Sequence, residues 1–371
     1  MRVLYFSRSY TPHDHRFLAA LAATRNDVHF LPLLAGGPGE DGRPLPEGVR
    51  AHPSIQERKG SFLTHLPGAV SRLKDRLRSI EPDLVHAGPI QQSAFLTALA
   101  GFKPLVAMSW GSDLLRGAVR GPGRWAAHHT LRRSDAFVCD CQAVRSAALR
   151  LGMPGERIVV FPWGVDLAYF SPKGTDGLRD HLGWGPAFVL LSARSWERGY
   201  GIEILVRGFI EAARAVPDLR LLMLGDGSLR PTVVRLLAEG GVADRVHLAG
   251  QVGYRDLPAH YRAADLYVSA SRSDGSSVSL LEAMACGLPA LVSDIPGNRE
   301  WVETGAEGWR FRDGDAADLA RGIERAYRQR ERLRELSARA RTTAEARADW
   351  SKNFPLLLDA YRLALGQEPP R

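Results

Sequence analysis

The chain alternates short apolar runs with longer amphipathic stretches along most of its length, and this pattern constrains its fold more than any other feature. Each short run predicts a strand buried on both faces, and each amphipathic stretch predicts a helix that covers the strands. Because such alternation is typical of parallel sheets with helices on both faces, the sequence predicts an α/β protein.

The pattern occurs once in each half of the chain. Strands are predicted in the first half at 3–7, 28–33, 84–87, 105–109, 136–139 and 158–161, and in the second half at 188–193, 219–224, 246–248, 266–269 and 290–292. Helices are predicted at 15–23, 69–80, 142–151, 202–215, 232–239, 258–263, 280–285, 315–329 and 331–348. The segment 162–186 between the halves is rich in Gly and Pro, which favours a hinge. A chain of 371 residues also exceeds the usual size of one domain, so two domains are predicted.

Composition excludes several classes of protein. Apolar residues make up 45% and charged residues 24%, which is typical of a globular protein in water. The apolar run at the N-terminus is too short for a signal peptide, and the stretch 93–108 is interrupted by Gly101, Lys103 and Pro104, so no membrane span is expected. Three cysteines favour a reducing compartment, and Cys139 and Cys141 are interpreted as small buried residues. A cytoplasmic location is therefore expected.

The net charge of +8 lies in the N-terminal half. Residues 1–165 hold 21 Lys and Arg against 13 Asp and Glu, whereas the rest of the chain holds 28 of each. Nucleic acid is disfavoured because the basic residues are not interleaved with aromatic ones. The excess positive charge also fits an anionic membrane surface or an acidic acceptor as the partner of this half. The helix predicted at 69–80 carries basic residues around an apolar stripe, which suits an ordinary surface helix or one that rests on anionic lipid.

The segment 269–297 carries the strongest chemical signal, and it reads SASRSDGSSVSLLEAMACGLPALVSDIPG. Asp274 and Glu282 stand eight residues apart around a Gly-Ser-Ser turn that predicts a helix start. This turn would follow the strand 266–269, at the edge where open α/β sheets bind ligands. Backbone N–H groups at a helix start suit a phosphate, and carboxylates accept hydrogen bonds from sugar hydroxyls. The pattern thus suits a nucleotide sugar, and the alternative is a capped helix with an incidental Glu.

This segment resembles the acid–seven–acid signature of the family 4 (group 1) retaining glycosyltransferases, with Asp274 in place of the usual first Glu. Further family motifs are resembled by 161–166 with 170–172, by 224–227, and by 248–252 with 261–266, so the likeness covers nearly the whole chain. It implies the GT-B fold, in which two Rossmann-like domains face a cleft and a C-terminal helix crosses back to the first domain. The implied boundaries are 1–165 for an acceptor-binding domain, 166–349 for a donor-binding domain and 350–371 for the crossover helix.

The resemblance also implies roles for residues of the second half. Asp274 would hold the hydroxyls of the transferred sugar, and Glu282 those of the ribose. Arg194 would face the diphosphate; the family's partner Lys, from a Lys-Gly pair, is absent, and Arg198 is the predicted substitute. Further donor-binding residues are implied in the three loops nearby: Gly225, Gly227, Val252, Ser276, Ser277 and Val278.

The first half departs more from the family. Where a Gly-Gly loop is common, this chain has His13, Asp14, His15 and Arg16, which would contact phosphate or acceptor unless Asp14 caps a helix start. Trp110 stands where many members have a His, and it would stack on a sugar or pack at a strand end. The remaining candidates on the acceptor side are His86, which as a lone histidine is more often structural, and Asp113. His13 and His15 lack a third ligand at metal-binding spacing, so no metal site is predicted.

The predicted function is therefore a retaining, metal-independent glycosyltransferase that takes its sugar from a nucleoside diphosphate sugar, with no other cofactor. Its acceptor would be a glycan or a lipid-linked intermediate of polysaccharide or glycoconjugate synthesis, met in the cytoplasm or at the inner face of the membrane. One alternative is a catalytically silent nucleotide-sugar-binding subunit of a glycan-synthesis complex; another is a relative that phosphorolyses or epimerises sugars. A dinucleotide-dependent oxidoreductase is disfavoured, because Arg230 occupies the third position of a Gly-x-Gly-x-x-Gly motif.

Overall fold

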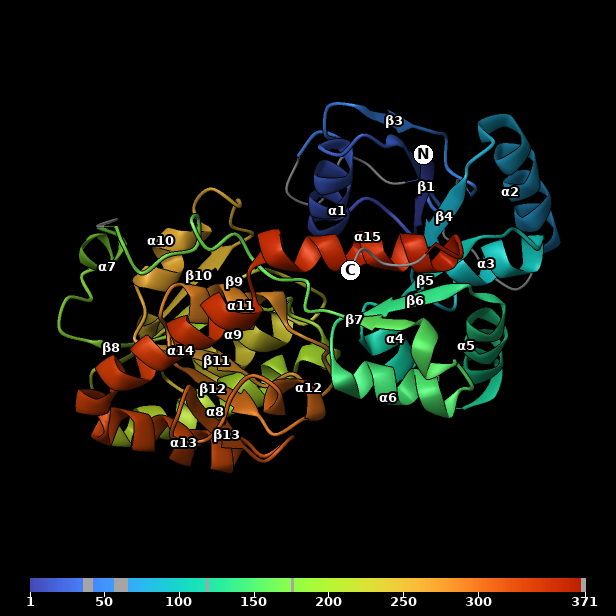
Figure 1. The fold of residues 1–371 in the computed structure, drawn as a ribbon. Helices are drawn as coiled ribbons and strands as arrows, with labels where there is room; N and C mark the ends of the chain where they lie inside the picture. Colours follow the sequence, from blue (N-terminus) through green and yellow to red (C-terminus); the bar gives the residue numbers. More distant parts are fainter. Residues whose placement is uncertain (36–42, 57–65, 118–119, 175–176, 368–371) are drawn as a thin grey trace. The chain divides into compact units, whose positions relative to one another are not determined.

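The chain forms two compact units in a computed structural model, which describes residues 1–35, 43–56, 66–117, 120–174 and 177–367 (Figure 1). The first unit comprises Met1–Phe161 and Phe354–Arg371, and the second comprises Pro162–Asn353. Residues 368–371 of the predicted crossover segment lie outside the described residues.

The first unit is built on a seven-stranded parallel sheet with the order β3-β2-β1-β4-β5-β6-β7. Its strands are β1 (Arg2–Ser7), β2 (Asp27–Pro32), β3 (Val49–Ala51), β4 (Leu84–Ala87), β5 (Leu105–Met108), β6 (Ala136–Cys139) and β7 (Ile158–Val160). Its helices are α1 (Pro12–Ala22), α2 (Leu66–Ile80), α3 (Ser93–Ala100), α4 (Ser112–Leu115), α5 (Gly121–Arg133) and α6 (Gln142–Arg150), with the 3-10 turn η1 (Gly155–Arg157).

The second unit repeats the plan with six parallel strands in the order β10-β9-β8-β11-β12-β13. Its strands are β8 (Phe188–Ser192), β9 (Leu219–Leu224), β10 (Val246–Gly250), β11 (Leu266–Ser269), β12 (Ala290–Ser293) and β13 (Gly308–Phe311). Its helices are α7 (Leu178–His181), α8 (Ile202–Ala215), α9 (Arg230–Glu239), α10 (Leu257–Arg262), α11 (Val278–Ala285), α12 (Pro296–Arg299), α13 (Ala316–Arg328) and α14 (Leu333–Arg347), with the 3-10 turns η2 (Arg198–Tyr200), η3 (Ala243–Arg245) and η4 (Arg330–Arg332).

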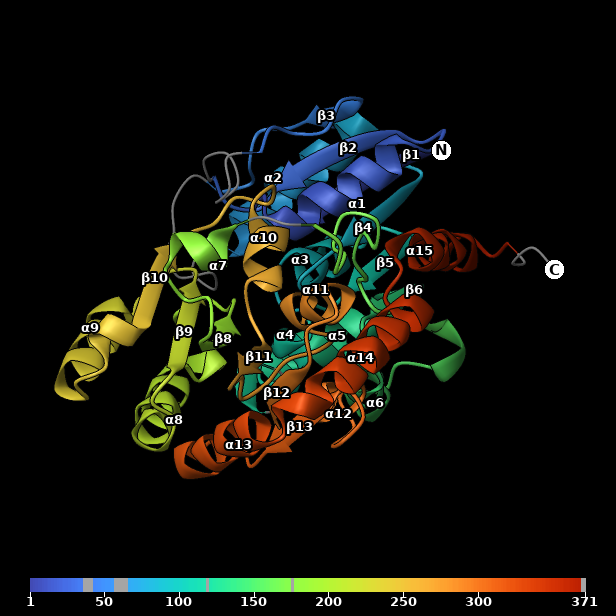
Figure 2. The ribbon, with the colours of Figure 1, turned by 90° about the vertical axis from the view of Figure 1, so that its left-hand side faces the viewer.

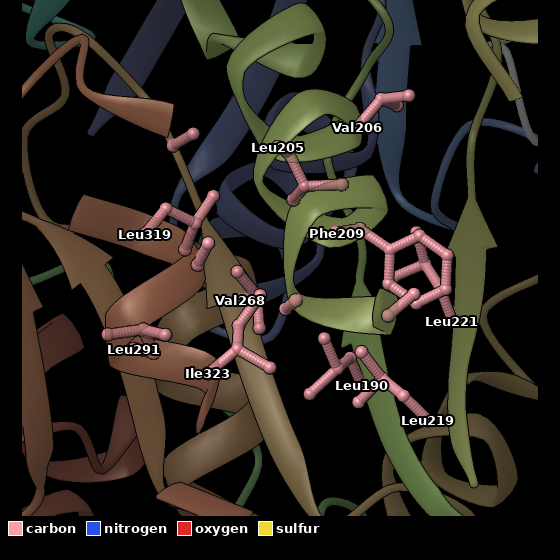
Figure 3. Close-up of a cluster of buried hydrophobic side chains, with 14 of the residues drawn as sticks. Leu190, Leu205, Val206, Phe209, Leu219, Leu221, Val268, Leu291, Leu319 and Ile323 are labelled. Atoms are coloured by element: carbon pink, nitrogen blue, oxygen red, sulfur yellow. The ribbon is translucent and has the colours of Figure 1, made fainter. Parts of the chain in front are cut away.

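Alternate residues of the strands in the second unit pack into two separate cores, because successive side chains of a strand point to opposite faces of the sheet. Leu190 of β8 packs with α8 and α13, whereas its neighbours Val189 and Leu191 pack with α11 and α14. Figure 3 shows the first of these cores, where Phe209 of α8 lies over the sheet. Gly208 lets α13 approach α8, since a Cβ there would lie 2.8 Å from Leu319.

The α/β class and the pair of Rossmann-like sheets are confirmed, and helices cover both faces of each sheet (Figure 2). The last helix, α15 (Trp350–Ala364), begins in the second unit and ends in the first. There the hydroxyl of Tyr361 lies 2.8 Å from Nδ1 of His86 on β4. None of the helices described is long and apolar enough to cross a bilayer.

Two edge strands were not predicted, and five helices begin one to three residues earlier than expected: α1, α2, α9, α10 and α11. β3 has three residues whose side chains are largely exposed, and β13 mixes Arg310 with aromatic residues, so neither reads as an apolar run. Helix α1 begins at Pro12 rather than near His15, because Thr11 caps it and Asp14 completes a capping box. Helix α11 begins at Val278, directly after the Gly-Ser-Ser turn.

Candidate functional site

The candidate site of the second unit lies where the strand order reverses. β8 and β11 are neighbours in the sheet, but the chain leaves them toward opposite sides, so the loops after them diverge at this point. Open α/β sheets bind ligands at such a topological switch point. Arg194 follows β8, and Asp274 lies between β11 and α11.

Arg194 forms the centre of a hydrogen-bonded network that joins the two loops. Its Nη2 donates to Oδ2 of Asp274 at 2.6 Å, and its Nη1 donates to the hydroxyls of Ser277 at 2.6 Å and Ser279 at 3.1 Å. The ring of Tyr200 lies 4.3 Å from Cζ of Arg194, at cation–π distance. The hydroxyl of Tyr267 on β11 lies 2.8 Å from that of Ser279 and extends the network to the sheet. The guanidinium is thus fixed in plane and in direction.

The Arg194–Asp274 pair is largely removed from water, with side-chain exposures of 11% and 16%. Burial raises the pKa of the Asp274 carboxyl, and the Arg194 charge opposes that rise. Burial lowers the pKa of Arg194, but the Asp274 carboxylate outweighs this effect and holds that pKa above its ordinary value. Each side chain therefore stabilises the charged form of the other, as in other buried ion pairs.

Glu282 lies on the second turn of α11, and Tyr261 of α10 orients its carboxylate. The Tyr261 hydroxyl donates to Oε2 of Glu282 at 2.8 Å. Burial raises the pKa of Tyr261 well above its ordinary value, and the Glu282 charge raises it further, so this phenol keeps its proton. One carboxylate oxygen is thereby held in place.

The start of α11 is shaped by its neighbours. Ser277 is the residue before the helix, so the N–H groups of Val278 and Ser279 have no acceptor within it. The hydroxyl of Ser276 accepts a hydrogen bond of 3.0 Å from Nε1 of Trp301, which turns this side chain into the protein. A Cβ at Gly297 would lie 2.5 Å from the carbonyl oxygens of Asp274 and Gly275, so only glycine lets α12 support the loop this closely.

The two glycines predicted after β9 pack against the loop after β8. A Cβ on Gly227 would lie 2.6 Å from the carbonyl oxygen of Trp196, and Gly225 has φ of +88°. The Trp196 N–H donates to the carbonyl oxygen of Asp226 at 3.0 Å. These contacts give the glycines a structural role whether or not they meet a donor.

Two of the predicted donor-binding residues lie apart from the Arg194 network. Arg198 begins the 3-10 turn η2, and its side chain is exposed. Tyr200, not Arg198, lies against Arg194. Val252, after β10, is half-buried and packs at the margin of the core beside α11.

The sequence did not predict four side chains that hold Arg194 and Glu282 in place, either directly or through a neighbour: Tyr200, Tyr261, Tyr267 and Ser279. Tyr261 lies in the segment 261–266 that resembles the family, but the sequence assigns it no role. Tyr200 immediately precedes the left-handed Gly201 that opens α8, which could have marked it as the residue turned toward the site. Ser279 and Tyr267 carried no signal, because hydrogen bonds between residues far apart in sequence leave no local pattern.

The histidines predicted to lie in a loop of the first unit stand instead on the first turn of α1. Asp14 is buried, and burial raises its pKa to about 6 against hydrogen bonds from Thr11, Ser7 and Tyr5 that lower it. Its carboxylate is thus occupied by the capping box and by the Tyr5 hydroxyl at 3.0 Å. His15 Nδ1 lies 2.6 Å from the Tyr10 hydroxyl.

Three other candidates of the first unit are tied into the protein. His86 is fully buried, and burial lowers its pKa to about 3, so it is neutral and bound to Tyr361. Asp113 accepts from the Ser109 hydroxyl at 2.6 Å and the Ile90 N–H at 3.0 Å, while burial raises its pKa. Trp110 is half-buried, with its ring centre 5.5 Å from that of His13. The contacts of His86 and Asp113 favour structural roles.

No cluster of three or more His, Cys, Asp or Glu suited to a metal ion occurs in the described ranges. All three cysteines are buried and unbridged.

Comparisons with known proteins give related matches for both units. Residues 13–169 match the family described as Glycosyltransferase Family 4, and residues 186–329 match Glycosyl transferases group 1. The EpsD protein of Bacillus subtilis (strain 168), a glycosyltransferase by its name, is 34% identical over 308 residues, covering 78% of this chain and 79% of that protein. The GDP-mannose-dependent alpha-(1-6)-phosphatidylinositol monomannoside mannosyltransferase of Mycolicibacterium smegmatis is 26% identical over 308 residues, with 79% and 78% covered.

Other matches define the limits of the likeness. The chain spans about half the length of several D-inositol 3-phosphate glycosyltransferases that it also matches. Among solved structures, Anabaena Alr3699/HepE in complex with UDP-glucose has a TM-score of 0.79 at 21% identity, with 99% of each chain covered. At 21% identity, this structural likeness supports the fold alone.

Proposed function

The chain belongs to the group 1 glycosyltransferases, and we propose on this basis that it moves a sugar from a nucleoside diphosphate sugar to an acceptor with retention of configuration. The observation that carries the proposal is the arrangement at the start of α11. The ion-paired Asp274 and Arg194 stand before the helix start, and Glu282 stands on its second turn.

The donor's diphosphate would be met by Arg194 and by the N–H groups at the helix start, with Ser276, Ser277 and Val278 in the turn. Departure of a nucleoside diphosphate places negative charge on the phosphate nearest the sugar, and fixed donors stabilise such charge without reorganising. Nε of Arg194 is buried and has no hydrogen-bond partner among the described residues, so one donor of this guanidinium is uncommitted.

Asp274 would accept hydrogen bonds from the transferred sugar, and Glu282 from the ribose. Both are acceptors only when ionised, which suits hydroxyl donors. In the retaining reaction the bond between the anomeric carbon and the phosphate oxygen breaks, and the acceptor oxygen bonds to that carbon on the same face. The leaving phosphate oxygen takes the acceptor's proton, so neither a separate base nor a metal ion is required.

We propose that the acceptor is a glycan or a lipid-linked intermediate bound by the first unit, in the cytoplasm at the inner face of the membrane. The charge excess of residues 1–165 supports an anionic acceptor or surface. The mannosyltransferase of M. smegmatis, whose name gives a phosphatidylinositol monomannoside as its acceptor, supports the lipid-linked case.

One observation supports a second candidate, the silent nucleotide-sugar-binding subunit. Tyr200 rather than a cation lies against Arg194, and Arg198 is exposed, so the network holds a single cation among the described residues. Fewer cations would weaken stabilisation of the leaving diphosphate.

Thermal-shift titration with uridine, guanosine and adenosine diphosphate sugars tests binding, and release of the nucleoside diphosphate with lipid and glycan acceptors tests transfer. We expect saturable binding, turnover, and loss of both in Glu282→Gln but not in the control Glu335→Gln, an exposed ion-pair residue on α14. Binding without turnover for every donor and acceptor would establish the silent subunit. No binding of any nucleotide sugar would overturn both readings.

A further inference from the structure

Helix α5 of the first unit concentrates positive charge without acidic residues. Between Asp113 and Asp135 the chain contains five arginines and no Asp or Glu. The arginines at 120, 124, 132 and 133 are exposed, and none of them forms an ion pair with another residue in the described part of the chain. Arg124, His128 and Arg132 are spaced four residues apart and so form one row along the helix.

Trp125 stands beside this row and is the most exposed large hydrophobic residue among those described, at 56%. Two neighbouring rings pack against its indole. The ring centre lies 5.4 Å from that of buried Phe95 on α3, edge to face, and 5.4 Å from that of His129. One side of the indole is therefore anchored in the unit, while more than half of its surface is offered to a partner.

Helix α2, the other basic helix of this unit, lacks such an apolar group. Its apolar side chains Leu73, Leu77 and Ile80 are buried in the core of its own unit. Arg78 is paired with Asp75 at 2.9 Å, which cancels part of the charge. The lipid-facing alternative drawn from the sequence therefore fits α5 better than α2. The two helices flank α3 in the same unit (Figure 1).

We propose that α5 docks the first unit on an anionic lipid surface, with Trp125 entering the interface and the row of Arg124, His128 and Arg132 facing the headgroups. Indole is apolar with one polar edge and prefers the boundary between lipid and water. Each arginine near an anionic membrane contributes roughly a five-fold gain in binding. A nucleic-acid surface would need several aromatic platforms, and Trp125 is the single exposed Trp, Tyr or Phe of α5.

This inference deepens the proposed function by naming the surface that would bring the enzyme to a lipid-linked acceptor. It concerns binding alone, and it can be measured without a donor or an acceptor. A failure of docking would leave sugar transfer to a water-dispersed acceptor intact, whereas a failure of the proposed function would leave docking intact.

Co-sedimentation of the full chain with vesicles is the test, using phosphatidylcholine alone and phosphatidylcholine mixed with phosphatidylglycerol. We expect binding to the anionic vesicles only, weakened roughly ten-fold by Trp125→Ala and about five-fold by Arg124→Gln or Arg132→Gln. Trp125→Phe should recover part of the loss. The matched controls Val234→Ala and Arg235→Gln, on exposed positions of α9, should bind as the unmodified chain does.

Three results would overturn the proposal. One is equal binding to neutral and anionic vesicles; another is unchanged binding by the Trp125 and arginine variants. The third is tighter binding to a single-stranded oligonucleotide that is lost in Trp125→Ala, which would assign α5 to nucleic acid. The arginine variants keep the test valid if Trp125→Ala disturbs the contact with Phe95 and lowers stability.

Discussion

Removing the charge of Arg194 is expected to destabilise the second unit in a way that depends on pH. In Arg194→Met, Asp274 stays buried but loses the guanidinium that lies 2.6 Å from its carboxylate. Two unit charges about 4 Å apart attract by about 4 kcal/mol at an effective dielectric constant of about 20. Breaking a buried pair by removing one partner costs about 3–5 kcal/mol. We therefore expect a loss of about 3–4 kcal/mol in the free energy of unfolding near neutral pH.

The sign of the pH dependence follows from the pKa of Asp274. Burial already raises this pKa, and the loss of Arg194 removes the charge that opposes the rise. A carboxyl whose folded-state pKa exceeds its unfolded value binds a proton more readily in the folded protein. The penalty in Arg194→Met should therefore be small below the unfolded pKa and should grow as the pH rises through the folded one.

A double-mutant cycle with Asp274→Asn separates this pair from other effects. Hydrogen exchange of peptides covering β8 and β9 reports the opening free energy of the second unit alone, which avoids treating a two-unit chain as two-state. We expect Arg194→Met/Asp274→Asn to be more stable than Arg194→Met at pH 8. Additive losses with no dependence on pH would refute the reasoning.

Three further predictions test the other residues described. Glu282→Gln should weaken nucleoside diphosphate binding by roughly ten- to a hundred-fold, and Tyr261→Phe by about five-fold, as measured by calorimetry. The reason is that an orienting hydrogen bond is worth about 1 kcal/mol and a hydrogen bond to a charged group is worth more. Tyr169→Phe is the control, because the Tyr169 hydroxyl binds the backbone at Arg255, and equal losses in all three variants would contradict the assignment. Asp14, with its pKa raised to about 6, should favour folding at low pH and cost the first unit stability as the pH rises through about 6, so Asp14→Asn should flatten the pH profile of hydrogen exchange in β1. Tyr361→Phe should leave His86 without its partner, lower the stability of the first unit by about 1–3 kcal/mol and leave donor affinity unchanged; a change in donor affinity would give His86 or Tyr361 a role at the site.

The fold could be predicted from the sequence where burial leaves a local pattern. β8 reads Phe-Val-Leu-Leu-Ser and is buried throughout, as a central parallel strand must be, so its apolar run is visible. β3 and β13 lie at sheet edges, where one side needs no apolar cover, and they carry no such run. The start of α1 was misplaced because Thr11 and Asp14 form a capping box that the Pro and His residues between them obscured.

The candidate site could be predicted only as far as its charged residues. The spacing of Asp274 and Glu282 follows from one helix start, so the sequence contains it. The side chains that hold the site in place come from other elements: Tyr261 of α10 binds Glu282, Tyr267 of β11 binds Ser279, and Tyr200 of the turn η2 lies against Arg194. No short-range pattern encodes such contacts, and the substitution of Arg198 for the absent family Lys was proposed from charge alone. The exposure of Arg198 and the stacking of Tyr200 on Arg194 weaken that substitution.

The ion pair also limits what Arg194 can offer a donor. Its two terminal nitrogens are committed to Asp274 and to two serine hydroxyls, so a diphosphate that binds these nitrogens, and not Nε alone, competes with a carboxylate for the guanidinium. If phosphate draws Arg194 away, Asp274 is released to accept from the sugar, and binding of the two parts of the donor is coupled. Asp274→Asn removes the competing charge and should therefore bind nucleoside diphosphate several-fold more tightly while transferring sugar more slowly. Calorimetry with the diphosphate alone, beside turnover with the full donor, measures both. Weaker diphosphate binding by Asp274→Asn would mean that the pair serves to hold Arg194 in position rather than to restrain it.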